Sequence, residues 1–297
     1  MSESVQHSWQ IRKPAVTSKK GMVASQHYLA SEAGAEILRL GGNAVDAAIT
    51  TGLTLGVVEP WMSGIGGGGY MTIYIAATQE VKVIEFGMQA PAAAEPDDYP
   101  LANSGNNSKE SFNWPKVVDD TNIHGPMAVA VPGYIKGISM ALENYGTMNW
   151  RDVFEPACQH AELGLPIDWF SAQKISFFSR GLKLYPETRG IYLSDGLPPT
   201  INLDGTISHL MLGKLAETYR RLQAASEAEF YGGDLAKTIV SDLNESGSKI
   251  SVEDLRDYSA SISNPISVPY RGSMLYVSGS LTAGPSIALA MTDLQER

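Results

Sequence analysis

Apolar residues recur with helical spacing in two successive stretches near the N-terminus. The first stretch predicts a helix over residues 31–40, and a pair of glycines follows it as a stop signal. Asn43 is suited to cap a second helix, because its short side chain can accept a backbone N–H at the helix start. That helix ends at Glu59, because Pro60 disfavours helical backbone at the residue before it.

A glycine-rich loop, Ser63–Tyr70, follows these helices and leads into strand-like sequence. The runs Met71–Ala76 and Lys82–Phe86 are rich in β-branched and aromatic residues. A short connection joins them, so we predict a β-hairpin. A short apolar run, Gly21–Ala24, predicts a buried strand ahead of the first helix. After the hairpin, Ala90–Ala94 takes the chain away from the sheet.

The rest of the chain is mainly helical up to residue 260 and then returns to strands. A helix is predicted from Gly133 to Asn144, and a polar stretch at residues 101–123 predicts an exposed loop. Further helical signals lie at 150–161, 207–225, 235–245 and 252–258, and strand-like runs lie at 266–270 and 273–277. The sequence has no internal repeat and no convincing linker, so residues 1–297 are expected to form a single domain.

Composition and charge narrow the classes of function. The chain has 297 residues, of which 43% are hydrophobic, which is typical of a globular protein. Its formal net charge of −10 argues against nucleic-acid binding, which needs a basic face. The most apolar stretch, Ala44–Val58, is too short to span a membrane, so no membrane partner is expected. No signal peptide follows Met1. We therefore expect a cytoplasmic chain if Met1 is the true start, and a periplasmic one only if the true N-terminus is missing.

Residues that could bind metal or act as a nucleophile are sparse. Cys158 is the one cysteine, which excludes an intrachain disulfide framework and a thiolate metal cluster. No two of the five histidines have metal-ligand spacing within one helix, so neither a metal nor another cofactor is expected. The serines lack the G-x-S-x-G context of an activated nucleophile. The residues by themselves therefore indicate no catalytic constellation.

The glycine-rich loop contains a match to a nucleotide-binding motif. Gly64, Gly66 and Gly69 satisfy G-x-G-x-x-G, the fingerprint of dinucleotide sites. That fingerprint requires a strand before the glycines and a helix after them, whereas this sequence predicts helix, loop and strand. A nucleotide-dependent oxidoreductase is therefore a rival hypothesis and not the preferred one. Two explanations of the glycines stay open: backbone angles or tight packing that only glycine permits, or a loop that a ligand or another chain approaches closely.

A long run around this loop carries a family resemblance. GGNAVDAAITTGLTLGVVEPWMSGIGGGGYMTIY (Gly41–Tyr74) resembles the large subunit of γ-glutamyltranspeptidase-family proteins. The resemblance continues in order along nearly the whole chain. Its further motifs are APAAA (Ala90–Ala94), VPG (from Val131), YG-x-x-x-W (Tyr145–Trp150), EPA (Glu155–Ala157), FYGG-x-LA (Phe230–Ala236), EDL-x-x-Y (Glu253–Tyr258), P-x-x-x-x-Y-R-G (Pro265–Gly272) and SLTAGPS (Ser280–Ser286).

The resemblance implies an α/β (α+β) fold of the N-terminal nucleophile hydrolase type, an αββα sandwich completed by a second, small subunit. In that family a precursor cleaves itself. The new N-terminal Thr of the small subunit is the nucleophile, and its own amine is the base. This chain resembles the large-subunit portion, and the family's Thr-containing junction does not occur before Arg297. We therefore expect no catalytic residue in this chain and a nucleophilic Thr in the partner.

One position departs from the pattern of family members that act on γ-glutamyl groups. Those members carry an Arg just before the A-P motif, which grips the α-carboxylate of the substrate. Gly87 stands at that position here. Loss of the clamp is expected to cost about 2–5 kcal/mol if the carboxylate stays buried and unpaired. The sequence therefore predicts an acyl group that is neutral, differently shaped or apolar, unless Arg189 or Arg271 supplies the clamp.

We interpret the chain as the large subunit of an amidohydrolase or acylase that cleaves a small amide through an acyl-enzyme. Its expected partners are the small subunit from the same precursor and that amide. The candidate substrate-binding residues are Glu85, Gly87, Met88 and Gln89, and the candidate pocket wall consists of Ser63, Gly64, Gly66, Gly67 and Gly68. The alternatives are a true γ-glutamyltransferase or glutathione hydrolase, and a non-catalytic binding homologue.

Overall fold

The computed structural model describes residues 15–102 and 114–295. Its strands are β1 (Gly69–Ile75), β2 (Glu80–Phe86), β3 (Leu165–Ile167), β4 (Ser208–Leu210), β5 (Ser261–Ser263), β6 (Ile266–Tyr270) and β7 (Ser273–Val277). Its α-helices are α1 (Tyr28–Arg39), α2 (Ala44–Val58), α3 (Tyr134–Tyr145), α4 (Trp150–Leu163), α5 (Trp169–Leu182), α6 (Pro186–Tyr192), α7 (Leu215–Ala225), α8 (Ala228–Tyr231), α9 (Asp234–Glu245), α10 (Val252–Asp257) and α11 (Gly284–Gln295). Short 3-10 turns cover Pro96–Asp98, Val118–Asp120, Pro126–Ala128 and Ser194–Gly196.

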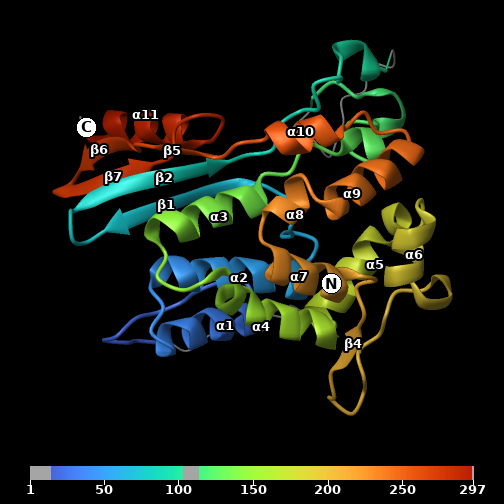
Figure 1. The fold of residues 1–297 in the computed structure, drawn as a ribbon, viewed down its shortest axis with the longest axis horizontal. Helices are drawn as coiled ribbons and strands as arrows, with labels where there is room; N and C mark the ends of the chain where they lie inside the picture. The colour runs from blue at the N-terminus through green and yellow to red at the C-terminus, as the bar shows by residue number, and fades with distance from the viewer. Residues whose placement is uncertain (1–14, 103–113, 296–297) are drawn as a thin grey trace, which may run out of the picture.

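Helices cover the strands from two sides (Figure 1). Helix α11 packs against β6 and β7, while α3 packs against β1 and β2. Helix α2 contacts α3 and also α1 and α4, and α4 in turn contacts α7. The helices therefore form layers around the strands, as the predicted α/β class requires.

The hairpin predicted from the sequence forms two of the three strands of one sheet. Strands β1, β2 and β5 make an antiparallel sheet in that order, with β1 at its edge. Gly69 lies opposite Phe86, and Tyr70 lies opposite Glu85. The hairpin is confirmed, although β1 already begins inside the predicted glycine loop. The register places the end of β2 beside that loop.

The capping residues decide where the first helices begin. His27 Nδ1 accepts the N–H of Leu29 at 3.2 Å, so α1 begins at Tyr28, ahead of the predicted start at residue 31. The predicted second helix is confirmed. Asn43 Oδ1 accepts the N–H groups of Val45 at 2.8 Å and Asp46 at 3.1 Å, as an N-cap side chain should.

Asp46 connects the start of α2 to the loop between α3 and α4. Its side chain is fully buried. One carboxylate oxygen, Oδ2, accepts the N–H of Asn43 at 2.7 Å and the hydroxyl of Thr147 at 2.6 Å. The other, Oδ1, accepts the N–H groups of Thr147 at 3.0 Å and Met148 at 3.2 Å. The carboxylate therefore satisfies N–H groups from two distant parts of the backbone, as a buried charge must.

Two of the predicted elements are wrong. The run Gly21–Ala24 is not a buried strand: it pairs with no strand among the described residues, and most of its positions are exposed. The predicted helix over 207–225 is also not continuous. Residues 208–210 form β4, which pairs with β3, and α7 starts only at Leu215. Gly213 lies between them with φ of 55°, a left-handed conformation that an α-helix cannot contain.

Two other segments differ from the sequence interpretation or extend it. Helix α11 occupies 284–295, where the sequence predicts no helix. Within the predicted exposed loop at 101–123, positions 103–113 lie outside the described residues. Leu101 and Val117 form an isolated antiparallel bridge, and the Val117 side chain is buried. The described part of this loop is therefore anchored at its base.

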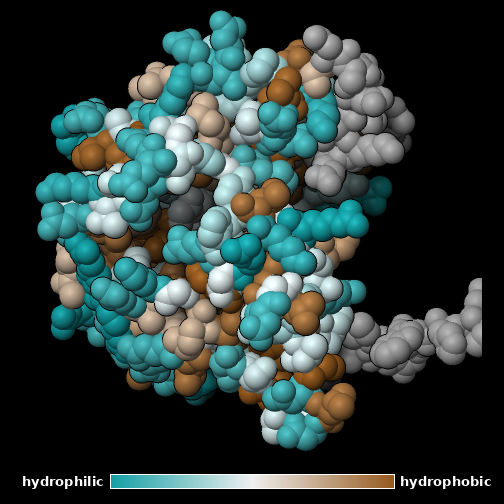
Figure 2. All heavy atoms as spheres, turned by 90° about the vertical axis from the view of Figure 1, so that its right-hand side faces the viewer, coloured by the Kyte–Doolittle hydropathy of each residue, from teal (hydrophilic) through white to brown (hydrophobic). Residues whose placement is uncertain are grey.

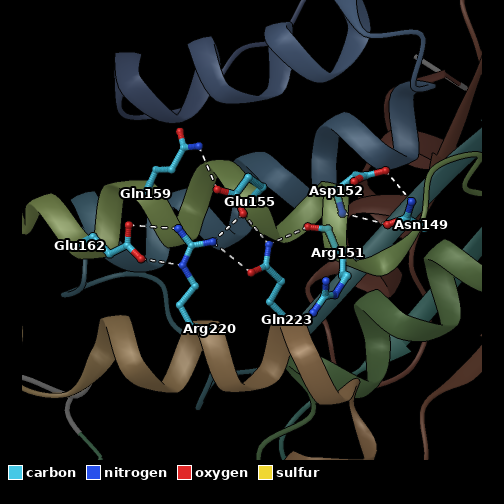
Figure 3. A network of polar contacts seen from close by, with 8 residues as sticks. All are labelled: Asn149, Arg151, Asp152, Glu155, Gln159, Glu162, Arg220 and Gln223. Atoms are coloured by element: carbon cyan, nitrogen blue, oxygen red, sulfur yellow. Dashed lines mark hydrogen bonds and ion pairs between the residues drawn. The ribbon is translucent and has the colours of Figure 1, made fainter.

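An ion-pair network holds α7 against α4 (Figure 3). Arg220 Nη1 donates to Glu155 Oε2 at 2.5 Å, and its Nε donates to Glu162 Oε1 at 2.6 Å. Gln223 Nε2 also donates to Glu155 at 2.7 Å. The hydrogen bond from Arg220, and next the one from Gln223, lower the pKa of Glu155 to about 2. The glutamate of the EPA motif therefore has a structural role. Because water reaches these side chains, the ion pairs contribute only modestly to the free energy of unfolding.

The molecular surface is mixed at the end that carries α5, α6 and α9. Figure 2 shows hydrophilic and hydrophobic residues interspersed among the described residues of this face. Among the described residues, no helix has both the length and the apolar character needed to cross a bilayer.

The Asp46 network predicts an acid-sensitive contribution to stability. Burial raises the pKa of this carboxyl, but the hydrogen bonds from Thr147, Asn43 and Met148 outweigh burial and lower it overall. A carboxyl whose pKa is depressed by folding stabilises the protein above its unfolded pKa of about 3.9, and this contribution disappears as the pH falls below that value. We expect Asp46→Asn to lower the free energy of unfolding by about 2–3 kcal/mol at pH 7. The difference from the unmodified protein should shrink as the pH approaches 3.

Urea unfolding at a series of pH values measures this effect. Asp242→Asn is the matched control, because Asp242 is an exposed aspartate on α9. A difference for Asp46→Asn that stays constant from pH 7 to pH 3 would contradict the assigned role of the carboxylate.

Candidate functional site

The structure brings the glycine loop and the Glu85–Gln89 segment into direct contact. A Cβ atom at Gly68 would lie 2.6 Å from the Phe86 carbonyl oxygen and 2.6 Å from Met88 Sδ. Real Cβ atoms do not approach other atoms so closely, so only glycine lets the loop reach β2 here. The two stretches proposed as pocket wall and substrate-binding segment are therefore neighbours in space.

The glycine loop is also tied to the start of α3. The Gly67 carbonyl accepts the N–H groups of Gly133 and Tyr134, both at 2.9 Å. Gly67 N–H in turn donates to the Gly64 carbonyl at 3.1 Å, which makes a tight turn within the loop. Helix starts leave N–H groups without partners inside the helix, and the Gly67 carbonyl satisfies two of them at the start of α3.

Phe86, the last residue of β2, packs among glycines from three elements. Besides Gly68, the position of a Cβ at Gly133 is 2.3 Å from the Phe86 carbonyl oxygen. Cβ positions at Gly69 and Gly137 lie 3.1 Å and 2.1 Å from atoms of its ring. Phe86 as a whole is 5% exposed. Glycines on β1 and α3 thus leave the space that the Phe86 ring occupies, and this packing fixes the end of β2.

Tight packing does not explain the glycines at two other positions of the loop. Neither Gly64 nor Gly66 has a positive φ, and a Cβ at either position would meet no heavy atom within 4 Å. Ser63, which precedes them, is half-buried, and its N–H donates to the Glu59 carbonyl at 3.3 Å. Tight packing therefore accounts for Gly68. The chain leaves open space beside Gly64 and Gly66.

Gly87 lies against an aromatic side chain of the neighbouring strand. A Cβ at Gly87 would be 3.2 Å from Tyr70 Oη, which is close enough to require a small shift of the tyrosine. Met88 follows with 56% of its surface exposed, and Tyr70 is 37% exposed. The surface at this position is therefore aromatic and thioether in character.

The other candidate residues of this segment are engaged with neighbouring strands. Glu85 Oε1 accepts the hydroxyl of Ser263 on β5 at 2.6 Å. Gln89 pairs with Val131 through N–H···O bonds of 3.2 Å and 2.8 Å. Glu85 is thus held within the sheet, while the backbone of Gln89 is held outside it.

Tyr258, to which the sequence interpretation assigned no role, contacts this segment directly. Its hydroxyl donates to the Gly87 carbonyl at 2.8 Å. Burial raises the pKa of Tyr258 to about 12, so the hydroxyl stays protonated and can donate at neutral pH. The signal available in the sequence was the EDL-x-x-Y motif, but its distance along the chain from Gly87 gave no indication of contact.

The arginines considered as alternative clamps lie elsewhere. Arg271 is in the turn between β6 and β7, with its guanidinium 5.2 Å from the centre of the Tyr270 ring. Arg189 belongs to α6. Among the described residues, neither side chain forms a hydrogen bond or an ion pair with residues 85–89.

Other candidate chemistry in the chain is limited. Cys158 is buried, and burial raises the pKa of its thiol to about 12, so it is a protonated core residue. Within the described ranges, no cluster of three or more His, Cys, Asp or Glu side chains could hold a metal ion. The glycine loop leads directly into strand β1 and not into a helix, so the arrangement required for a dinucleotide fingerprint does not occur.

Comparison with known proteins gives a consistent result. The family model described as gamma-glutamyltranspeptidase matches residues 30–297. The glutathione hydrolase proenzyme of Bacillus subtilis (strain 168) is 34% identical over 279 residues, which are 94% of this chain and 45% of the relative. The acylase ACY 1 proenzyme of Pseudomonas sp. (strain V22) is 34% identical over 261 residues, 88% of this chain and 45% of the relative. The chain thus spans less than half the length of these relatives.

Solved structures give the same picture of the fold. Helicobacter pylori gamma-glutamyltranspeptidase has a TM-score of 0.81 and 29% identity, with 91% of this chain and 73% of that chain covered. The cephalosporin acylase from Bacillus halodurans has a TM-score of 0.74 and 25% identity, with 93% of this chain and 49% of that chain covered. These similarities confirm the predicted N-terminal nucleophile hydrolase fold class.

The contrast between Gly68 and Gly66 yields a prediction about stability. We expect Gly68→Ala to lower the free energy of unfolding by about 1–3 kcal/mol, because the new methyl group overlaps the Phe86 carbonyl and Met88. Gly66→Ala should change it by no more than about 0.5 kcal/mol, since its surroundings are open. Urea unfolding of both variants measures the difference. Equal destabilisation by the two substitutions would show that the loop is arranged differently.

Proposed function

Because this chain belongs to the gamma-glutamyltranspeptidase family, we propose that it is the large-subunit portion of an amidohydrolase or acylase that does not require a γ-glutamyl group. The observation that carries the proposal is Gly87 beside Tyr70, at the position to which the family resemblance assigns the clamping Arg of members that act on γ-glutamyl groups. The relatives include proteins named glutathione hydrolase and proteins named acylase at the same 34% identity, so overall similarity does not discriminate between the two.

The physical argument concerns the charge of the acyl group. A γ-glutamyl substrate brings an α-carboxylate, and burying it without a cationic partner is unfavourable. Tyr70 and Met88 offer aromatic and thioether surface at this place, and Glu85 adds a carboxylate that would repel another. This surface favours a neutral or apolar acyl group over a γ-glutamyl group.

In the proposed mechanism this chain supplies selection and the partner supplies the chemistry. The N-terminal Thr of the small subunit attacks the amide carbonyl, with its own α-amine accepting the hydroxyl proton. The protonated α-amine then passes this proton to the amide nitrogen, the C–N bond breaks and the amine leaves, and attack by water or another amine then breaks the ester bond and releases the acyl group from the Thr oxygen. The segment Glu85–Gln89 orients the acyl group for this attack, and the glycine loop borders it.

Two alternatives predict different outcomes. A true glutathione hydrolase would need a cationic group that does not lie beside residues 85–89 in this structure. The names of several relatives favour this alternative. A non-catalytic binding homologue would have a companion chain without an N-terminal Thr.

The division of labour is tested by comparing two preparations. We expect the chain of residues 1–297 alone to hydrolyse no amide, because its partner carries the nucleophile. The complete translation product that contains this chain should hydrolyse acyl anilides after it has been cut. N-terminal sequencing of the new fragment should return Thr, and replacing that Thr by Ala should abolish turnover. Amide hydrolysis by the isolated chain, or a companion fragment without Thr, would refute the proposal.

Acyl-group selection is tested by restoring the clamp. In the complete protein, Gly87→Arg should raise kcat/KM for a γ-glutamyl anilide by about 10-fold or more, because the guanidinium can pair with the α-carboxylate. Activity on a neutral acyl anilide should not rise. Gly87→Gln is the control, since it fills similar space without charge. If a folded Gly87→Arg protein gains nothing over Gly87→Gln, then Gly87 does not occupy the clamp position.

A further inference from the structure

Two side chains of the EDL-x-x-Y motif bind the backbone at the two ends of the segment that follows β2. Asp254 Oδ1 accepts the N–H of Ala92 at 2.9 Å, and the Tyr258 hydroxyl donates to the carbonyl of Gly87 at 2.8 Å. Two side chains from one short stretch thus hold the backbone at both ends of residues 87–92. Nothing in the proposed reaction explains this arrangement, because neither residue belongs to the candidate pocket.

The segment of residues 87–92 has few other restraints of its own. After Phe86 it leaves the sheet, and between Gly87 and Ala92 only the Gln89–Val131 bridge links it to another part of the described backbone. Met88, in the middle of the segment, is 56% exposed. The position of the segment therefore depends on the bonds at its two ends, on this bridge and on the packing of Met88 against Gly68.

Asp254 is held in the orientation that reaches Ala92. Its second carboxylate oxygen, Oδ2, accepts the N–H and the hydroxyl of Ser251, both at 2.8 Å, in the capping box of α10. Leu255 is fully buried and anchors the same helix in the core. One oxygen thus serves the helix cap, and the other is free to bind the segment.

Tyr258 is held by aromatic packing and by the absence of a side chain at Gly133. Its ring stacks on Tyr231 with centroids 5.9 Å apart and 14° between the planes. The Tyr231 hydroxyl is fixed in turn, because it donates to the Pro132 carbonyl at 2.9 Å and accepts the N–H of Lys136 at 3.1 Å. A Cβ at Gly133 would lie 2.1 Å from Tyr258 Oη. The glycine of the VPG motif therefore leaves the space in which Tyr258 reaches Gly87.

We propose that Asp254 and Tyr258 are positioning residues that fix the backbone of Gly87–Ala92 and thereby set which acyl group the enzyme prefers. This inference rests on the proposed function only in taking residues 85–89 as the acyl-binding surface. Neither side chain needs to touch the substrate. Their effect passes through the Gly87 carbonyl and the Ala92 N–H to the placement of Gly87 and Met88.

The test compares Tyr258→Phe and Asp254→Ala in the complete, processed protein. Hydrogen exchange of the peptide covering residues 87–92 should become about 10-fold faster in each variant, because the segment opens locally more often. The ratio of kcat/KM for a neutral acyl anilide to that for a γ-glutamyl anilide should fall about 5-fold, because a loosened wall discriminates less.

Each variant has a matched control in the chain. Tyr219→Phe also removes a tyrosine hydroxyl bonded to a backbone carbonyl, that of Leu53 at 3.0 Å, but away from the segment. Asp168→Ala likewise removes a capping aspartate whose Oδ1 accepts a backbone N–H, that of Ser171 at 2.8 Å, but on α5. Neither control should change exchange at 87–92 or the substrate ratio.

The two measurements separate the inference from the proposed function. Unchanged exchange at 87–92 in both test variants would overturn the positioning role, whatever the activity does. Faster exchange with an unchanged substrate ratio would overturn the link to selectivity, and would show that the acyl-binding surface lies elsewhere. A shift of the ratio in the controls as large as in the test variants would reduce the effect to general destabilisation, and would also overturn the inference.

Discussion

Close backbone packing around Phe86 is the constraint on which the arrangement of the site depends. Its carbonyl and ring occupy space that Cβ atoms at Gly68, Gly69, Gly133 and Gly137 would fill. The glycine loop, the edge strand and the start of α3 therefore meet at one residue. The Gly67 carbonyl then binds the first N–H groups of α3, which links packing and hydrogen bonding at the same point. Because interiors are packed at near-crystalline density, one added methyl group here displaces several elements together.

Local signals in the sequence were sufficient for much of the fold. The cap at Asn43 and the proline at position 60 define α2, and the β-branched run after the glycines defines the hairpin. The failures came where distant partners decide the structure. Residues 208–210 form a strand because β3 pairs with them, and Gly213 then interrupts any helix. Residues 21–24 are apolar, yet among the described residues no neighbouring strand pairs with them.

For the site, the sequence singled out the glycine loop and the segment at Gly87 but could not show that they lie side by side. The glycine pattern and the departure at Gly87 are visible in the sequence, whereas the contact of Gly68 with Met88 depends on the register of β1 and β2. Tyr258 lies far along the chain, so its bond to Gly87 has no local signature. The carboxylates show the same pattern, because Asp46 and Asp254 each bind backbone N–H groups from a distant segment. Part of the acidic excess of this chain thus serves to fasten loops.

Strand β1 lies at the edge of its sheet among the described residues, and it follows directly from the glycine loop. An edge strand presents backbone N–H and carbonyl groups along one side, which makes it a template for pairing with another polypeptide. Tyr70 and Tyr74 lie on the same exposed face of this strand and add aromatic surface. The outer side of β1 therefore offers backbone groups with which a further strand could pair.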